Sequence, residues 1–167
     1  MNPDLTYDFI VDKENNVITV KREFAAGVPL VWDAYTKSEI LDQWWAPKPW
    51  KAETKKMDFK VGGTWLYAMR GPAGEEHWSI AQYTTIEPQK KFIGVDAFTD
   101  SNGTINPELP QSTWEVTFAP KGEHTLVEMK ITYPSLAQLE ETIKMGFKEG
   151  LAMGMENLDA LLPTLKK

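Results

Sequence analysis

The sequence contains no cysteine and only two histidines in 167 residues. Without cysteine there is no disulfide, no thiolate nucleophile and no cysteine metal ligand. His77 and His124 are far apart in the sequence, so we expect no structural zinc site. Neither a phosphate-binding loop nor a Ser-His-Asp arrangement is present. We therefore expect neither a bound metal nor a cofactor.

Basic residues are also few, since 24 acidic residues face 18 basic ones and the net charge is −6. Such a surface repels phosphate backbones and anionic lipid, so we expect no nucleic-acid partner. No apolar run approaches the length of a membrane span, and the N-terminus shows no secretory signal. We expect a soluble, cytoplasmic protein with no membrane insertion. We also expect one domain over residues 1–167, as a monomer or a homodimer.

Tryptophan, in contrast, is abundant, with seven residues. Large aromatic side chains usually fill a core. Their clustering is also typical of an aromatic-lined pocket. Six of them are Trp44, Trp45, Trp50, Trp65, Trp78 and Trp114.

The last third of the chain, from Ser135 to about Leu162, predicts one long amphipathic helix. Ser135 and Gln138 fit a capping box. Apolar residues then recur at steps of three and four, which places them on one helical face. They are Leu136, Leu139, Ile143, Phe147, Leu151, Leu158, Leu161, Leu162 and Leu165.

Three glycines, Gly146, Gly150 and Gly154, lie within this apolar face or at its edge. Each interior glycine costs about 1 kcal/mol relative to alanine, which calls for a compensation. Either the helix backbone lies close against a sheet, or space is left open beneath the helix. We take the second explanation as our hypothesis, and it predicts a cavity.

The first third predicts a hairpin followed by two short helices. Val17–Phe24 alternates as a strand, and residues 1–15 supply a possible N-terminal edge strand and turn. Pro29 is well placed in the first turn of one helix. Thr36 with Glu39 suggests a capping box for a second helix from Ser38 to about Trp45.

The middle of the chain predicts successive strands joined by turns. Hairpin-length links imply an antiparallel meander, which gives an α+β domain. Period-2 alternation gives most strands one apolar face. For the strand that contains Asp96, the alternation does not decide which face points inward, and a bulge is possible there. The connection Asp100–Gln111 is either a mobile lid or a surface loop. The predicted strands are Ala52–Phe59, Thr64–Arg70, Glu76–Ile86, Lys91–Phe98, Thr113–Phe118 and Thr125–Tyr133.

Several sequence runs resemble one known family over roughly residues 16–162. They are Arg22–Ala26, Val31–Thr36, Leu41–Pro47, Gly62–Trp65, Met69–Pro72, Ile86–Pro88, Asn106–Pro110 and Ile131–Ser135. Together they resemble the START-like (SRPBCC) superfamily, and more narrowly the family named after the activator of the heat-shock-protein-90 ATPase. Ala26, Gln89 and Phe147 depart from the residues usual in that family.

The resemblance implies a helix-grip (START/Bet v 1-like) fold, in which a curved antiparallel sheet wraps around a long C-terminal helix. We expect a ligand cavity between that helix and the apolar sheet face. The alternative is a filled core without a cavity. The expected pocket residues are Trp45, Trp65, Tyr67, Met69, Trp78, Trp114, Phe147, Gly150 and Leu151.

Polar candidates for the pocket are few. Glu140 on the apolar helix face could act as a buried general base, although a glutamate so placed more often reaches solvent. His77 follows two glutamates beside a hairpin loop, which favours a surface position. Asp96 points inward in only one of the two registers. We assign no catalytic residue from the sequence.

Three functions fit these observations. The first is a binding protein for a hydrophobic, aromatic or lipid-like small molecule, which we expect rather than an enzyme. The second is an enzyme similar to polyketide cyclases that uses the same cavity. The third is an interaction module that modulates a chaperone ATPase. A buried acid–base pair facing the cavity would favour the second.

Overall fold

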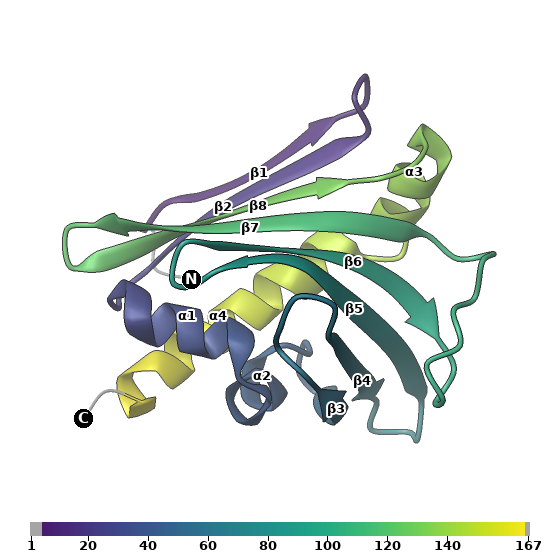
Figure 1. Ribbon diagram of the computed structural model, residues 1–167, viewed down its shortest axis with the longest axis horizontal. Coiled ribbons are helices and arrows are strands. Elements are labelled where there is room, and N and C mark those ends of the chain that lie inside the picture. The colour runs from purple at the N-terminus through teal and green to yellow at the C-terminus, as the bar shows by residue number, and fades with distance from the viewer. Residues whose placement is uncertain (1–4, 166–167) are drawn as a thin grey trace.

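Eight antiparallel strands form one curved sheet in the order β1-β2-β8-β7-β6-β5-β4-β3 (Figure 1). The structure is a computed structural model that describes residues 5–165; the first four residues of the predicted segment 1–15 lie outside that range. β1 forms one edge of the sheet, as predicted, and β3 forms the other. The strands are β1 (Tyr7–Asp12), β2 (Val17–Phe24), β3 (Lys51–Met57), β4 (Thr64–Arg70), β5 (Glu76–Glu87), β6 (Lys91–Thr99), β7 (Gln111–Lys121) and β8 (His124–Thr132).

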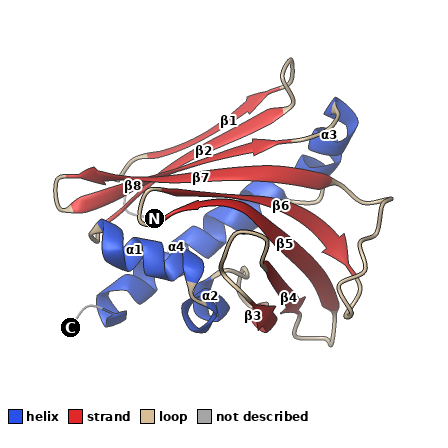
Figure 2. Ribbon diagram, in the orientation of Figure 1, coloured by secondary structure: helices blue, strands red, loops and turns tan. Residues whose placement is uncertain are grey.

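Within residues 5–165, four helices complete the α+β fold. α4 crosses one face of the sheet diagonally, with α1 and α2 near its C-terminal half (Figure 2). The helices are α1 (Val28–Thr36), α2 (Ser38–Trp44), α3 (Leu136–Lys144) and α4 (Phe147–Leu165). This arrangement of a curved sheet around a C-terminal helix confirms the predicted fold class.

The helix starts show which local signals the fold uses. Proline stands in the first turn of α1, as predicted. The capping box predicted for α2 is wrong: Lys37 is the N-cap, and the Thr36 hydroxyl donates to Trp32 O at 2.8 Å. Ser135 does cap α3 by accepting from Gln138 N at 3.2 Å. The Gln138 side chain instead accepts from Gln111 N at 2.9 Å, which ties α3 to β7.

The predicted continuous helix from Ser135 to Leu162 is wrong in one respect, because it is divided at Gly146. This glycine has a φ of +89°, the left-handed conformation that ends many helices. Its N–H donates to Ile143 O at 3.0 Å, which closes the end of α3. α4 then begins at the next residue and takes a new direction (Figure 1).

The sheet faces follow the predicted alternation. On β8, Val127, Met129 and Ile131 are completely buried against the helices. β6 pairs with β7 without a shift, and Asp96 lies opposite Ser112, on the helix-covered side. The irregularity lies on β5 instead, between Tyr83 and Thr85, and not in β6 as considered above. The structure therefore settles the register that the sequence left open.

The middle of α4 is anchored against the C-terminal end of α2. At Gly154, an added Cβ atom would lie 3.2 Å from Trp45 O and 3.4 Å from Trp44 O. This glycine is thus explained by close packing rather than by open space. Three residues after Gly154, the Asn157 side-chain amide donates to Ala46 O at 3.1 Å and so satisfies a carbonyl beyond the end of α2.

A buried ion pair joins the C-terminal half of α4 to the sheet. Arg22 on β2 is completely buried and pairs with Asp159, whose side chain is 23% exposed. The Arg22 guanidinium also donates to Glu23 O and lies 4.8 Å from the Phe24 ring centroid. Burial raises the pKa of Asp159, and the Arg22 charge opposes that rise. Breaking such a pair leaves an uncompensated buried charge, so the contact fixes α4 strongly.

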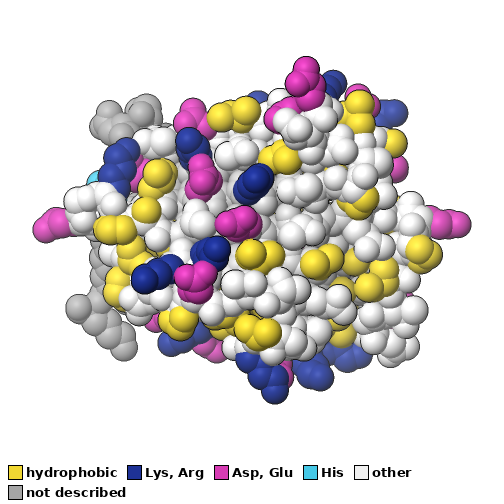
Figure 3. Space-filling view, turned by 45° about the horizontal axis from the view of Figure 1, so that its top comes forward, with side chains coloured by type: hydrophobic (Ala, Val, Ile, Leu, Met, Phe, Trp, Pro, Cys, Tyr) yellow, Lys and Arg dark blue, Asp and Glu magenta, His cyan; other side chains and the backbone are white. Residues whose placement is uncertain are grey.

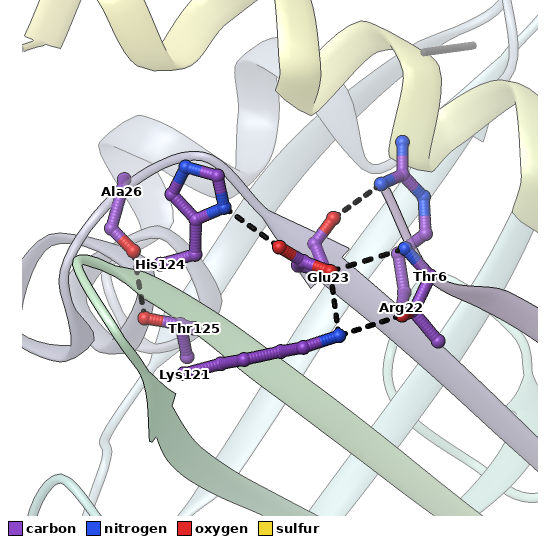
Figure 4. Close-up of polar contacts among 7 residues, drawn as sticks. All are labelled: Thr6, Arg22, Glu23, Ala26, Lys121, His124 and Thr125. Atoms are coloured by element: carbon purple, nitrogen blue, oxygen red, sulfur yellow. Dashed lines mark hydrogen bonds and ion pairs between the residues drawn. The ribbon is translucent and has the colours of Figure 1, made fainter. Parts of the chain in front are cut away.

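A second polar cluster, centred on Glu23, joins the end of β2 to the β7–β8 hairpin (Figure 4). The Glu23 carboxylate accepts from Lys121 Nζ at 2.9 Å and from Thr6 N at 3.2 Å, and it lies 2.7 Å from His124 Nδ1. The His124 and Lys121 contacts lower the pKa of Glu23 to about 2. Nearby, the Thr125 hydroxyl donates to Ala26 O at 2.7 Å.

On the face shown in Figure 3, basic and acidic side chains lie interspersed, with hydrophobic side chains scattered among them. Within residues 5–165, no helix is long and apolar enough to cross a membrane.

The two α4 glycines provide a matched test of how the helix is anchored. Gly154→Ala should lower the free energy of unfolding by about 1 kcal/mol, because the new methyl group meets backbone carbonyls that cannot move independently. Gly150→Ala should raise it by about 0.5–1 kcal/mol, because the nearest atom to its added Cβ is Pro47 Cγ at 3.8 Å. Urea denaturation of both variants measures this. Equal effects would contradict the assigned close approach.

The Glu23 cluster predicts a pH-dependent stability. Its folded pKa of about 2 lies below the ordinary 4.5, so its stabilisation is present above pH 4.5 and is lost as the pH falls to about 2. Glu23→Gln should lower the free energy of unfolding by about 1–3 kcal/mol at neutral pH, with a smaller difference at low pH. Thermal unfolding across this range tests it. Glu128→Gln, which removes an exposed ion pair with Lys21, is the control.

Candidate functional site

A cavity of about 260 Å³ lies beneath the N-terminal half of α4, between this helix and the inner face of the sheet. Strands β4 to β7, the segment after α2 and the junction between α3 and α4 all contribute to its walls. The lining residues are Trp45, Pro47, Tyr67, Met69, His77, Ser79, Asp96, Ala97, Phe98, Pro110, Ser112, Trp114, Tyr133, Thr142, Met145, Gly146, Phe147, Gly150 and Leu151.

Aromatic rings form most of one wall. Trp45 and Trp114 have ring centroids 6.0 Å apart, and Phe147 of α4 meets Trp114 edge-on at 5.8 Å. Their indole N–H groups have partners within the wall: Trp45 Nε1 donates to Tyr67 Oη at 3.0 Å, and Trp114 Nε1 donates to Ser112 Oγ at 2.9 Å. These bonds fix the rings around the cavity.

The cavity reaches the surface beside the junction of α3 and α4. Met145 at that junction is 53% exposed, and His77 at the start of β5 is also exposed. His77 stacks on Trp50, with 5.4 Å between ring centroids. At Gly150 no backbone presses on the helix, in contrast to Gly154. Of the two compensations considered for the glycines, open space applies to Gly150 and close packing applies to Gly154. Gly146 also faces open space, but its positive φ is what requires a glycine there.

The structure brings together seven of the nine aromatic and apolar residues expected at the pocket. Trp65 lies behind the wall, where it stacks on Tyr67 at 4.0 Å between centroids and lines a separate cavity of about 40 Å³. Trp78 lies on the outer face of the sheet, with Lys55 Nζ 5.7 Å and Arg70 Cζ 5.8 Å from its ring centroid. The seven at the cavity are Trp45, Tyr67, Met69, Trp114, Phe147, Gly150 and Leu151.

The outward position of Trp78 has a structural cause. The long connection before β7 packs on the outer face of the sheet, where the Cβ position at Gly103 lies 3.6 Å from Leu66 and 3.9 Å from Ile80. Apolar side chains on that face are therefore covered. Both faces of β5 then carry apolar side chains, so the alternation of polar and apolar residues does not identify the inner face. The connection is a surface loop, one of the two alternatives expected, because most of its residues are exposed. It packs on the outer face of the sheet and brings only Pro110 to the cavity.

The three polar candidates occupy different environments. Asp96 faces the cavity from β6, and His77 stands at its rim. Glu140 does not reach the cavity, because its exposed side chain turns to solvent and pairs with Lys13 at 3.5 Å. Among the described residues, no group of three His, Cys, Asp or Glu side chains is placed to hold a metal ion.

Asp96 has an unusual electrostatic environment. Burial raises the pKa of its carboxyl to about 7. Burial also raises the pKa of three neighbouring tyrosines, Tyr67, Tyr83 and Tyr133, and the Asp96 charge adds to each rise. For Tyr133 the pKa is about 12, with the Thr142 hydroxyl opposing the shift. The cavity thus holds a carboxyl group that can gain or lose a proton near neutral pH.

Sequence reasoning missed several polar lining residues. Ser79 and Ser112 are not distinctive in sequence, but both could have been found by strand pairing. Ser79 lies opposite Tyr67, and Ser112 lies opposite Asp96. Thr142 and Met145 carry no such signal, because their position depends on the break at Gly146.

Asp96 predicts a second pH dependence, of opposite sign to that of Glu23. Its folded pKa of about 7 lies above the ordinary 3.8, so between these values the folded state binds more protons, and stability falls as the pH rises. The free energy of unfolding of Asp96→Asn, relative to that of the wild type, should therefore increase as the pH rises from about 4 to about 8. The increase should be on the order of 1 kcal/mol or more. Urea denaturation of both proteins at these two pH values measures the gain. A difference that does not change with pH would contradict the assigned burial.

Solved structures of related proteins share this architecture. Protein Ms6760 from Mycobacterium smegmatis is 31% identical, with a TM-score of 0.87 over 95% of this chain and 96% of that chain. A protein from Arthrobacter aurescens is 30% identical, with a TM-score of 0.88 over 94% and 91% of the two chains. A protein from Staphylococcus epidermidis is 26% identical, with a TM-score of 0.81 over 94% and 95%.

No curated protein matches the chain. A family model does match residues 25–163, which include most of the sheet, α1 to α3, nearly all of α4 and every cavity-lining residue. The runs that suggested the resemblance lie largely inside this range. The chain therefore belongs to the family described as activator of Hsp90 ATPase homolog 1-like protein, with the START-like helix-grip fold.

Proposed function

We propose that this protein binds a small hydrophobic molecule, aromatic or lipid-like, in the cavity beneath α4. The observation that carries the proposal is the cavity itself, about 260 Å³ with aromatic walls and an opening at Met145. Protein interiors are otherwise closely packed, so a cavity of this size is a notable exception. Pockets lined mainly by apolar and aromatic side chains, with a few polar groups, are typical ligand sites.

The architecture also explains why the cavity stays open. The close contact at Gly154 holds the middle of α4 in place, and the Arg22–Asp159 pair holds its C-terminal half. Hydrogen bonds from Trp45 and Trp114 hold the opposite wall. A pre-formed pocket loses less conformational entropy on binding than one that must be ordered by its ligand.

Asp96 favours a second candidate function, an enzyme similar to polyketide cyclases. A carboxyl with a pKa of about 7 can exchange a proton with a bound substrate near neutral pH. The Tyr67 hydroxyl, from the neighbouring wall, is a hydrogen-bond donor that could orient a substrate carbonyl. This candidate requires Asp96 for turnover, whereas the binding function requires only the cavity.

Filling the cavity should abolish binding of an apolar probe. Ser79→Leu places a larger side chain on the inner face of β5, whereas Gln82→Leu adds the same side chain at an exposed position on the same strand. The fluorescence of N-phenyl-1-naphthylamine, a neutral apolar dye, should rise on addition of the wild type and of Gln82→Leu. Its affinity for Ser79→Leu should fall at least tenfold, because the dye and the leucine compete for the same volume.

Thermal unfolding of both variants shows whether each remains folded. Equal dye affinity for Ser79→Leu and the wild type, with both folded, would contradict the proposed site. Binding that disappears equally in Gln82→Leu would contradict it as well.

A further inference from the structure

Asp96 is the one carboxylate among the described residues that line the cavity, and it lies at the inner end. It borders both the main cavity and the smaller cavity of about 40 Å³ behind it, whereas Met145 and His77 stand at the exposed end. A ligand that enters beside Met145 therefore meets Asp96 with its leading group. The rest of the ligand then lies between the aromatic wall and α4.

No hydrogen-bond donor or cation within the described residues satisfies the Asp96 carboxyl. The two nearby indole N–H groups are already bonded, to Tyr67 Oη and to Ser112 Oγ. The described lining contains no lysine or arginine, and burial alone accounts for the behaviour of the Asp96 carboxyl. The Asp96 residue is only partly exposed, and ionising a carboxyl that is removed from bulk water and has no protein partner is costly.

The groups around Asp96 share one electrostatic preference. The rings of Trp45, Trp114 and Phe147 border the cavity and carry partial negative charge on their faces. A cation beside such rings is stabilised, and more strongly where water is excluded. The carboxylate adds a full negative charge at the inner end. Positive charge on the ligand would therefore be favoured by both features, and a ligand carboxylate would be repelled.

We propose that the cavity selects a small aromatic or alkyl amine, whose protonated nitrogen lies against Asp96 and whose apolar body lies along the Trp45, Trp114 and Phe147 wall. This inference rests on the proposed function, and it names the ligand class of the same site. The size of the cavity, about 260 Å³, lies below the range of roughly 300–1,000 Å³ found for drug-sized ligands. A simple arylalkylamine is therefore an appropriate probe.

Three probes of nearly equal shape separate charge from apolar burial: 4-phenylbutylamine, 4-phenylbutan-1-ol and 4-phenylbutanoate. At about pH 8 the amine is protonated and Asp96 is ionised. Isothermal titration calorimetry should rank their affinities as amine, then alcohol, then carboxylate, with the amine at least tenfold tighter than the alcohol. An alcohol or a carboxylate that binds as tightly as the amine would overturn the proposal.

Two variants assign the preference to Asp96. Asp96→Asn should weaken amine binding at least tenfold and leave alcohol binding nearly unchanged. Glu115→Gln, which removes a half-exposed carboxylate from the outer face of β7, should change neither. Unchanged amine affinity in a folded Asp96→Asn would overturn the assignment.

The pH dependence gives a further readout, since amine binding to the wild type should weaken below about pH 7 as Asp96 gains a proton. The groups that face Asp96 from other strands are Tyr67, Tyr83, Tyr133 and, at the rim, His77. The tyrosines stay neutral in this range, because burial raises their pKa values. Amine binding to His77→Gln should weaken below about pH 7 as it does in the wild type, which assigns the response to Asp96. If His77→Gln loses this response, the assignment to Asp96 is overturned.

The test separates this inference from the function on which it rests. If the neutral dye binds and none of the phenylbutyl probes does, the amine preference is wrong and the hydrophobic binding function stands. If neither the dye nor the probes bind, the binding function itself fails.

Discussion

The close approach of α4 to α2 at Gly154 is the constraint on which the rest of the structure depends. The helix backbone there lies against the carbonyl oxygens of Trp44 and Trp45, and no larger residue fits without displacing them. The buried pair of Arg22 and Asp159 fixes the C-terminal half of the helix to the sheet. A helix is nearly straight and the sheet beneath it is curved, so close packing from the middle of α4 onward leaves space beneath its first turns. The cavity follows from this difference in shape.

Much of the fold could be predicted because alternation and turn chemistry act locally. The bounds of β2 and β4 match their predicted ranges, and the other strands differ by a few residues. The division of the last helix could not be predicted with the same means. A glycine in an apolar helical face fits an interior position or a C-terminal left-handed position equally well, and the contacts of Gly146 decide between them. Thr36 failed as a cap for a related reason, because its hydroxyl found a partner within the preceding helix.

The candidate site shows the same division between local and tertiary information. Tyr67 and Trp114 could be placed on the inner face by alternation, and the structure finds them there. Trp78 could not, because a distant loop covers the apolar side chains on the outer face and so removes the contrast between the two faces. The position of Asp96 could not be predicted either, because both faces of β6 carry apolar residues and alternation does not identify the inner one. Only the pairing with β5 and β7 determines which face it occupies.

The break at Gly146 separates two parts of the chain that would otherwise share one hydrogen-bonded ladder. α4 carries the anchoring contacts at Gly154 and Asp159, whereas Thr142 of α3 and Met145 border the cavity near its entrance. Because the ladder is interrupted between them, sequence changes in α3 can alter the shape of the entrance without shifting the register of the anchored helix. The break is thus a physical route to new ligand preferences on one unchanged framework.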